Sequence, residues 1–336
     1  MSIIKQMQKN YKTISIIGLA KNAGKTVTLN YLIDKAYEEN ITIGITSTGR
    51  DGESSDLVTN TEKPTIFVTE GVLVATAKQA LLMSDAKLEI LETTDFKTAM
   101  GEVIIARVRH SGNIQIAGPV NATDIKTVSD MLHNFGAEIV FVDGAIDRKA
   151  ASSPLITDAC VIATGAVLSR DMKKVIEKTA YTVECYQLNQ VENNIRKKLK
   201  KGCSTCIVDD MGEIACLYEE TGISAAKILS ENINSTTRYV YVKGAITSML
   251  LNELSKSNFA KSFKLVIDDA TKIFVELRDW NEAKKRGLKI EVLDSIKILA
   301  LTINPFSPEG YYFDSAEFLE QMQYFIKDVE IIDVLA

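Results

Sequence analysis

The sequence contains little histidine, no excess of positive charge and no long apolar run. Only His110 and His133 occur among its 336 residues, which excludes a histidine-rich metal site. The 39 basic and 44 acidic residues give a net charge of −5, so a nucleic-acid-binding face is not expected. No stretch of about 18 uninterrupted apolar residues occurs, and the chain starts without a signal-peptide pattern. We therefore expect a cytoplasmic protein with no membrane span.

Cysteine is also scarce, with five residues at positions 160, 185, 203, 206 and 216. An odd number without a regular framework indicates reduced thiols. Cys203 and Cys206 have the C-x-x-C spacing of some metal and redox sites. A zinc site needs a second such pair, which Cys216 alone does not supply. The alternative is that these are ordinary buried thiols.

Proline is equally rare, and two of the five prolines lie within residues 304–312. This segment reads Asn-Pro-Phe-Ser-Pro-Glu-Gly-Tyr-Tyr. It predicts a rigid loop, placed either over a site or at a partner surface.

The most informative segment that is present covers residues 18–26 and reads Gly-Leu-Ala-Lys-Asn-Ala-Gly-Lys-Thr. A largely apolar run, 14–17, precedes it, and a helix-compatible stretch, 27–39, follows it. A strand, a glycine-bounded loop ending in Gly-Lys-Thr and a helix form the arrangement that holds the phosphates of a nucleotide. We therefore expect ATP as the ligand, together with Mg²⁺.

The residue types in this loop suit a triphosphate. Backbone N–H groups and the positive end of the helix macrodipole converge at a helix N-terminus. Gly24 lets the backbone approach the phosphates, Lys25 places an ammonium group near the β- and γ-phosphates, and Thr26 offers its hydroxyl to Mg²⁺. The predicted nucleotide-binding residues are Gly18, Lys21, Asn22, Ala23, Gly24, Lys25 and Thr26.

A carboxylate that binds Mg²⁺ or orients water is expected at the end of an apolar strand. Asp143 follows the apolar run 139–142 and is the first candidate for this role. Together with Lys25, it forms the predicted catalytic set. The alternative is that Asp143 ends a strand and caps a turn.

Two further acids, Asp51 and Glu53, follow the strand-like run 41–46. The carboxyl ends of parallel strands meet at one edge of a sheet, so these side chains are expected near the phosphate loop. The predicted metal ligands are therefore Thr26, Asp51, Glu53 and Asp143. The alternative is a polar loop shaped by its glycines.

The order of the expected elements predicts an α/β protein. In the first half, β-branched apolar runs alternate with helical patterns, among them 72–83 and 124–135. This alternation predicts a mainly parallel sheet with helices on both faces. A polar and then basic run near 189–202 indicates a boundary. We therefore expect a P-loop nucleotide-binding domain over 1–190 and a second, smaller α/β domain over 200–336.

Five residues separate Gly18 from Gly24, one more than in the standard phosphate loop. This spacing, Gly-x5-Gly-Lys-Thr, resembles dethiobiotin synthetase and the cobyrinate synthase-type ligases, a branch of the P-loop proteins. In some relatives a second loop lysine reaches a nucleotide across a dimer. The resemblance thus makes a homodimer possible, with Lys21 in that role or simply solvated, and it implies Glu70 as a further metal ligand.

Four short motifs are similar to one narrower group. They are Lys-Asn-Ala-Gly-Lys-Thr, Thr-Gly-Arg-Asp-Gly-Glu, Val-Asp-Gly-Ala-Ile-Asp-Arg and Ala-Thr-Gly-Ala, at 21–26, 48–53, 142–148 and 163–166. The group is the ATPase-type reactivase subunit of lysine 5,6-aminomutase. The resemblance implies an ATP-driven protein that ejects damaged cobalamin from a B12-dependent mutase, together with a second ATPase subunit.

Three functions remain open. The first is an ATPase that couples Mg-ATP hydrolysis to a conformational change in a partner enzyme. The second is an ATP-dependent ligase or kinase acting on a small metabolite, and the third is a nucleotide-binding regulator with little turnover. A Cys-His glutaminase in the distal half is excluded, because both histidines lie in the first domain.

Overall fold

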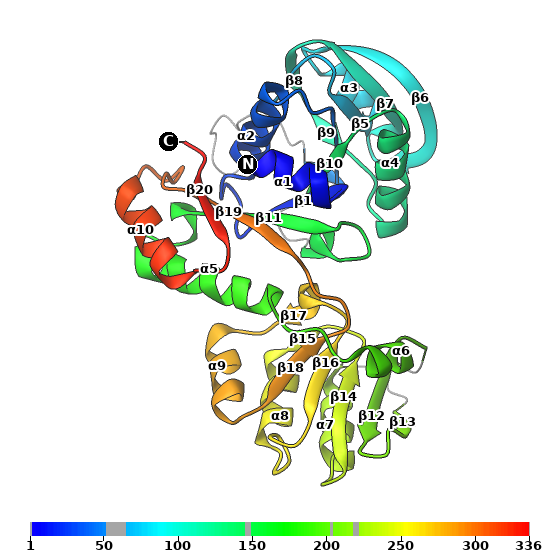
Figure 1. The fold of residues 1–336 in the computed structure, drawn as a ribbon, viewed down its shortest axis with the longest axis vertical. Coiled ribbons are helices and arrows are strands. Elements are labelled where there is room, and N and C mark those ends of the chain that lie inside the picture. Colours follow the sequence, from blue (N-terminus) through cyan, green and yellow to red (C-terminus); the bar gives the residue numbers. More distant parts are fainter. Residues whose placement is uncertain (1, 52–64, 145–148, 202–203, 218–221, 336) are drawn as a thin grey trace. The chain divides into compact units, whose positions relative to one another are not determined.

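The computed structural model describes residues 2–51, 65–144, 149–201, 204–217 and 222–335. The chain divides into two compact units. Unit 1 comprises Met1–Ala180 and Lys297–Ala336, and unit 2 comprises Tyr181–Ile296. Both units contain helices and strands, so the protein is mixed α/β (Figure 1).

Nine described strands of unit 1 form one large sheet, in the order β20-β19-β11-β1-β10-β2-β5-β7-β6. Neighbours from β20 to β5 run parallel, and β7 and β6 join them antiparallel. The prediction of a mainly parallel sheet is thus confirmed. The strands are β1 (Thr13–Gly18), β2 (Ile43–Ser47), β5 (Leu73–Ala77), β6 (Lys87–Thr98), β7 (Gly101–His110), β10 (Ile139–Asp143), β11 (Ala159–Gly165), β19 (Ile298–Asn304) and β20 (Glu330–Asp333).

Helices cover both faces of this sheet. Alternate residues of a strand point to opposite faces, and β10 illustrates the result: Phe141 packs with one buried cluster, Val140 and Val142 with another. The first cluster includes residues of α1 (Ile3–Asn10) and α2 (Lys25–Glu38), and the second includes residues of α4 (Ala122–Asn134). The central strands are therefore buried on both sides, as parallel strands usually are.

The remaining elements of unit 1 lie around the sheet. The remaining described α-helices are α3 (Lys78–Leu82), α5 (Met172–Tyr186), which continues into unit 2, and α10 (Ser315–Phe325). Two short antiparallel pairs join β3 (Arg50–Asp51) to β9 (Ile116–Ala117) and β4 (Ile66–Val68) to β8 (Gly112–Ile114).

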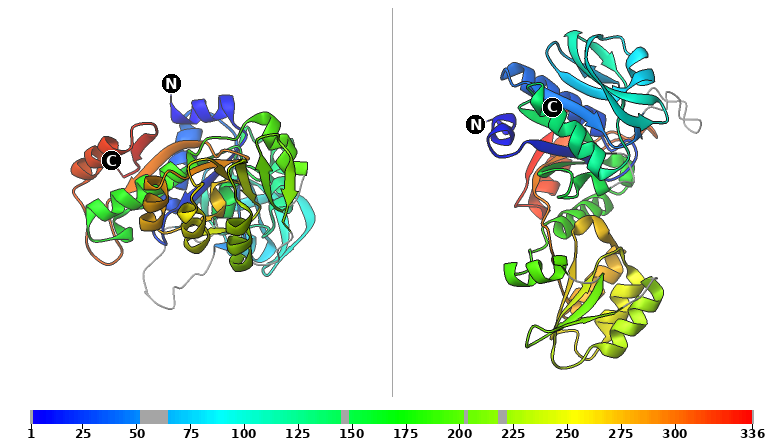
Figure 2. Two further views of the ribbon diagram at one scale, coloured as in Figure 1. Left: turned by 90° about the horizontal axis from the view of Figure 1, so that it is seen from below. Right: turned by 90° about the vertical axis from the view of Figure 1, so that its right-hand side faces the viewer.

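Unit 2 has its own sheet, whose described strands follow the order β13-β12-β14-β16-β18. Strands β14, β16 and β18 are parallel, and α8 and α9 make the crossovers between them (Figure 2). Helix α6 packs on one face of the sheet through Ile195 and Leu199. The bounds are α6 (Asn193–Lys201), β12 (Thr205–Asp209), β13 (Ile214–Cys216), α7 (Gly222–Asn232), β14 (Thr237–Val242), β15 (Ile246–Thr247), α8 (Ser248–Lys256), β16 (Lys264–Ile267), β17 (Ile273–Phe274), α9 (Leu277–Lys285) and β18 (Lys289–Val292).

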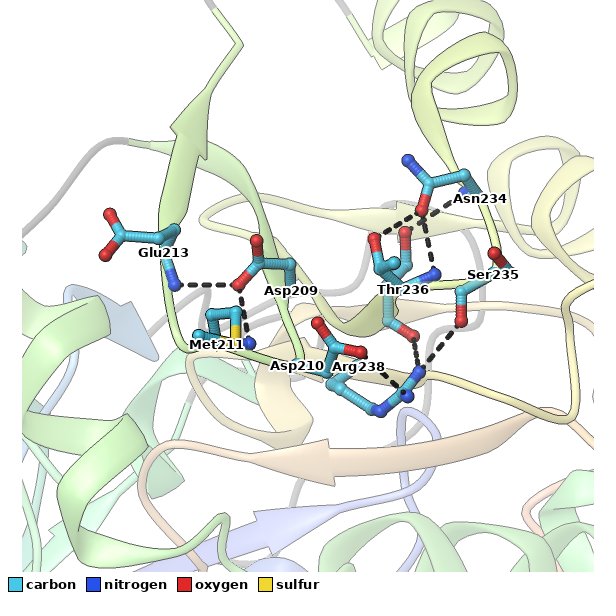
Figure 3. Close-up of polar contacts among 9 residues, drawn as sticks. Asp209, Asp210, Met211, Glu213, Asn234, Ser235, Thr236 and Arg238 are labelled. Carbon is cyan, nitrogen blue, oxygen red and sulfur yellow. Dashed lines mark hydrogen bonds and ion pairs between the residues drawn. The ribbon is translucent and has the colours of Figure 1, made fainter.

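Side-chain hydrogen bonds stabilise the turns that precede β13 and β14 (Figure 3). In the β12–β13 turn, Asp209 Oδ1 accepts hydrogen bonds from the backbone N–H groups of Met211 and Glu213. Before β14, Asn234 Oδ1 accepts from the Thr236 N–H at 2.9 Å. Such Asx turns favour one local conformation of the chain, which sets where each strand starts.

The helix expected over 72–83 is wrong in its first half. The structure has strand β5 at Leu73–Ala77 and a helix only from Lys78. All residues of β5 are buried, because it lies between β2 and β7. A short, fully buried strand has no alternating pattern, so periodicity alone does not distinguish it from a buried helix.

The division into units differs from the expected domains. Residues 200–336 were expected in the second domain, yet Lys297–Ala336 belongs to unit 1. The reason is the pairing of β19 with β11, which places β19 and β20 in the large sheet. Unit 2 is therefore inserted between β11 and β19. Among the described residues, no helix combines the length and apolar character needed to cross a bilayer.

Candidate functional site

The carboxyl ends of neighbouring strands meet at one edge of the unit 1 sheet. In register, Asp143 of β10 lies between Ile16 of β1 and Ser47 of β2. On the other side of β1, strands β11 and β19 end together at the paired residues Gly165 and Asn304. Parallel α/β sheets bind ligands at this edge. The segment between β1 and α2, where the phosphate loop is predicted, lies at the same edge.

Steric limits explain why glycine stands at two positions of the predicted phosphate loop. Gly24, the N-cap of α2, has a φ of 102°, in the left-handed region that favours glycine. A Cβ on Gly24 would lie 3.0 Å from the Cβ of Asn304. A Cβ on Gly18 would lie 2.9 Å from Lys25 Cγ, so the lysine stem passes directly over Gly18. The course of the loop therefore depends on both glycines.

Lys25 is the first residue of α2, and its ammonium group contacts Asp143. Lys25 Nζ donates a hydrogen bond to Asp143 Oδ1 at 2.9 Å and another to the carbonyl of Gly144. The two charged side chains are only 9% and 6% exposed. Charges attract more strongly where water is excluded, and either charge left alone there is destabilising. The two predicted catalytic residues therefore form a buried ion pair.

The other predicted loop residues differ in exposure. Ala23 is buried, Lys21 and Asn22 are exposed, and Thr26 is half-buried in the first turn of α2. Asn22 has a positive φ of 62°, which turns the chain just before Gly24. The Thr28 N–H donates to the Gly24 carbonyl at 2.8 Å, so regular helical hydrogen bonding starts here.

The chemistry of the site suits a phosphate anion that binds together with a metal cation. The first N–H groups of a helix have no acceptor within the helix, and the positive end of the macrodipole lies there. Lys25 adds a full positive charge. Mg²⁺ takes oxygen ligands, often one or two protein groups together with phosphate oxygens and water. The Asp143 carboxylate and the Thr26 hydroxyl are donors of this kind, so the residues present fit the metal.

The segment after β2 is held against the same strand end. The Thr48 N–H donates to the Asp143 carbonyl at 2.9 Å. The backbone of Arg50 and Asp51 pairs with β9, which places that backbone beyond the end of β2. For Asp51, the structure describes the position of the backbone alone. Its side chain and the whole of Glu53, both predicted metal ligands, lie outside the described residues.

Glu70, implied as a metal ligand by the resemblance, is not at this edge. It is exposed and precedes β5, which begins at Leu73. Leu73 pairs with Gly44, near the amino end of β2, whereas Asp143 pairs with the last residue of β2. Glu70 therefore lies at the opposite edge of the sheet, and the implied role is wrong.

Asn304 begins the segment 304–312 that was predicted as a rigid loop over a site or at a partner surface, and it lies at this edge although it was not among the predicted site residues. It ends β19, and its Cβ limits the space at Gly24. Its Oδ1 accepts a hydrogen bond from the Phe306 N–H at 3.0 Å, which orders the following loop. The Asn-Pro pair after an apolar strand was a usable signal. Because residues 200–336 were expected in the second domain, the sequence did not predict that Asn304 lies beside the loop before α2.

The cysteines do not form a metal site in the described residues. No group of three or more His, Cys, Asp or Glu side chains there is able to hold a metal ion. Cys206 is free, and burial raises the pKa of its thiol to about 11. Cys203 lies outside the described residues. Cys160 and Cys185 are also free, whereas Cys216 is disulfide-bonded, so the expectation of reduced thiols throughout is wrong.

Comparisons of the chain with protein-family models, with curated proteins and with solved structures find no match in any of the three. Support for a function therefore comes from the geometry of this sheet edge and from the sequence motifs.

Proposed function

We propose that the protein binds Mg-ATP at the loop between β1 and α2 and hydrolyses it. The observation that supports this most directly is the buried pair of Lys25 and Asp143. It joins the amino end of the first long helix to the end of the adjacent parallel strand. A cation, a carboxylate and a helix N-terminus at one point are what a P-loop ATPase requires.

Without nucleotide, the ammonium group of Lys25 is satisfied by Asp143 and by the Gly144 carbonyl. The β- and γ-phosphates would take over these hydrogen bonds, because phosphate oxygens are strong, charged acceptors. The Asp143 carboxylate would then be free to hold Mg²⁺ or to orient the attacking water. When bound, Mg²⁺ would neutralise part of the charge that develops on the phosphates.

We further propose that the hydrolysis of ATP acts on a partner enzyme. Following the sequence resemblance, ATP turnover drives a conformational change in a B12-dependent amino-acid mutase, with a second ATPase subunit as partner. Strands β11 and β19 precede and follow unit 2 in the chain, and their carboxyl ends, Gly165 and Asn304, lie at the edge of the predicted phosphate loop. A change in the loop would act directly on the carboxyl end of β11, from which the chain continues through α5 into unit 2, and this supports a coupling role. The chain returns from unit 2 at the opposite, amino end of β19.

Binding and phosphate release with Lys25→Ala test the site itself. A charge-assisted hydrogen bond contributes about 1.5–3 kcal/mol, so we expect the Mg-ATP affinity to fall at least about tenfold. Phosphate release should also be lost. Calorimetry with Mg-ATP and Mg-GTP measures the first effect, and a phosphate-release assay measures the second. Lys9→Ala is the control, because Lys9 is an exposed lysine of α1, which precedes the amino end of β1 and so lies away from the loop.

Thr26→Ala is the second variant. It leaves the buried Lys25–Asp143 pair intact, so its effect on binding does not come from a loss of folding. It should weaken ATP binding mainly when Mg²⁺ is present. Unchanged phosphate release by Lys25→Ala would overturn the site. Turnover that depends on a small metabolite, rather than on a partner protein, would favour a ligase or kinase instead.

A further inference from the structure

A cavity in unit 2 is lined by positive charges and by no acidic side chain. Its volume is about 530 Å³. It lies where the carboxyl-terminal ends of the neighbouring helices α8 and α9 meet. Its basic lining residues are Lys256, Lys261, Lys285 and Arg286. In a chain with more acidic than basic residues, a cavity with this lining is distinctive.

The backbone is shaped to bring these side chains together. Lys256 ends α8, Lys285 ends α9, and Arg286 is the C-cap of α9. Lys261 comes from the connection between α8 and β16 and lies against Gly287. A Cβ on Gly287, whose φ is +93°, would lie 2.8 Å from Lys261 Cγ. Glycine at 287 therefore makes room for the stem of Lys261.

The charges of the cavity do not cancel. Arg286 is paired with Glu282 at 2.5 Å. Within the described residues, Lys256, Lys261 and Lys285 form no ion pair. Lysines at helix ends often serve only to balance the macrodipole, and each helix end carries about −0.5 charge. Two helix ends therefore balance about one lysine, and a charge of about +2 remains.

We infer that this cavity binds the phosphate group of a small phosphate monoester. Such a group carries about −1.5 to −2 charge at neutral pH and has three acceptor oxygens, which matches the residual charge. Ser255, 3% exposed, lies in the same lining; its hydroxyl donates to the Asn252 carbonyl and accepts from Arg286 Nη1, and so it helps to position Arg286. The volume falls in the range of about 300–1,000 Å³ of small-molecule sites, so it exceeds what phosphate alone fills.

The inference is tested by calorimetry on the full chain at low salt. The probes are phenyl phosphate, inorganic phosphate and benzenesulfonate, which is a monoanion. We expect one site per chain that binds phenyl phosphate most tightly. The double variant Lys256→Gln/Lys261→Gln should lower that affinity at least about tenfold, since two charged contacts are lost. Lys284→Gln is the matched control: Lys284 lies on the same helix end but contacts Glu184 and does not line the cavity.

Binding should persist in Lys25→Ala, which separates this cavity from the proposed ATP site. Loss of binding in Lys25→Ala would place the probe at the phosphate loop and overturn the inference. Equal affinity for benzenesulfonate, or an unchanged affinity in the double variant, would indicate an adventitious ion only. The altered lysines are exposed, so circular dichroism should show an intact fold in each variant.

Discussion

The hydroxyl groups of Thr28 and Thr302 lie 2.6 Å apart, although 274 residues separate them in the sequence. Both residues are buried. Their hydrogen bond ties α2, which starts at Lys25, to β19, the strand by which the chain returns from unit 2. The helix of the proposed ATP site and the returning strand are therefore joined inside the core of unit 1.

Thr302→Val should lower the free energy of unfolding by about 1–2 kcal/mol, because it leaves the buried hydroxyl of Thr28 without this partner. Thr28→Val should cost less, because the Thr302 hydroxyl still donates to the Ile162 carbonyl. The double variant should lose much less than the sum, since replacing both partners by apolar groups of the same shape is nearly neutral. Urea unfolding followed by circular dichroism measures all three. Strictly additive effects would contradict the hydrogen bond.

Gly24→Ala should weaken both the fold and ATP binding. A left-handed backbone costs a residue with a Cβ about 1–2 kcal/mol, and the new Cβ would also press on Asn304. Gly136→Ala is the control, because Gly136 has a similar φ of 106° but nothing within 4 Å of its added Cβ. Thermal unfolding and calorimetry with Mg-ATP compare the two variants. Equal loss of stability in both, with normal ATP binding in Gly24→Ala, would argue against the close packing.

Asp143→Asn should keep Mg-ATP binding and lose turnover. It also breaks the buried ion pair, which typically lowers stability by about 3–5 kcal/mol when one partner remains. The variant should therefore melt earlier than the natural protein without nucleotide. Mg-ATP should recover much of this loss, because the phosphates give Lys25 new acceptors. Thermal shifts and phosphate release measure the two effects. A normal rate of hydrolysis would move the catalytic role to Asp51 or Glu53.

Asp294 should stabilise unit 2 in a pH-dependent way. Burial alone would raise the pKa of Asp294, but Lys200, at 2.6 Å, and Arg196 outweigh burial and lower it. A carboxyl whose pKa is lower in the folded state stabilises fully above its unfolded value of about 4. That stabilisation disappears as the pH falls through the folded pKa. The pH dependence therefore has a definite sign.

Asp294→Asn should consequently lower the melting temperature between about pH 5 and pH 8, and the difference from the natural protein should vanish near pH 2. Melting curves at each pH measure this difference. Glu253→Gln is the control, an exposed acid of the same unit with no ion pair among the described residues. A difference that persists at the lowest pH would mean that Asp294 acts through packing rather than charge.

Local patterns were sufficient for much of unit 1. The apolar run before the glycine loop, the helix after it and the acid at the end of the 139–142 run all needed only neighbouring residues to be recognised. The structure places them in β1, α2 and β10, with Lys25 on Asp143. The parallel pairing of β1 with β10 brings Lys25 and Asp143 together. In the sequence, an apolar run ending in an acid predicted that Asp143 lies at this edge.

The places where sequence reasoning failed depend on distant neighbours. The nature of β5 depends on burial between β2 and β7, which no local period reveals. The position of Glu70 depends on which end of β5 meets which end of β2. The basic cavity forms only where the ends of α8 and α9 come together.

The amino-acid sequence by itself determined that the chain is α/β, that its main sheet is largely parallel, and that a glycine-bounded loop with Lys25 joins its first central strand to a helix. Only the tertiary structure decided that β19 returns to the first sheet and brings Asn304 against Gly24. The physical reason is that propensity and periodicity act over one or two turns of chain, whereas strand order is selected by burial between residues far apart in sequence.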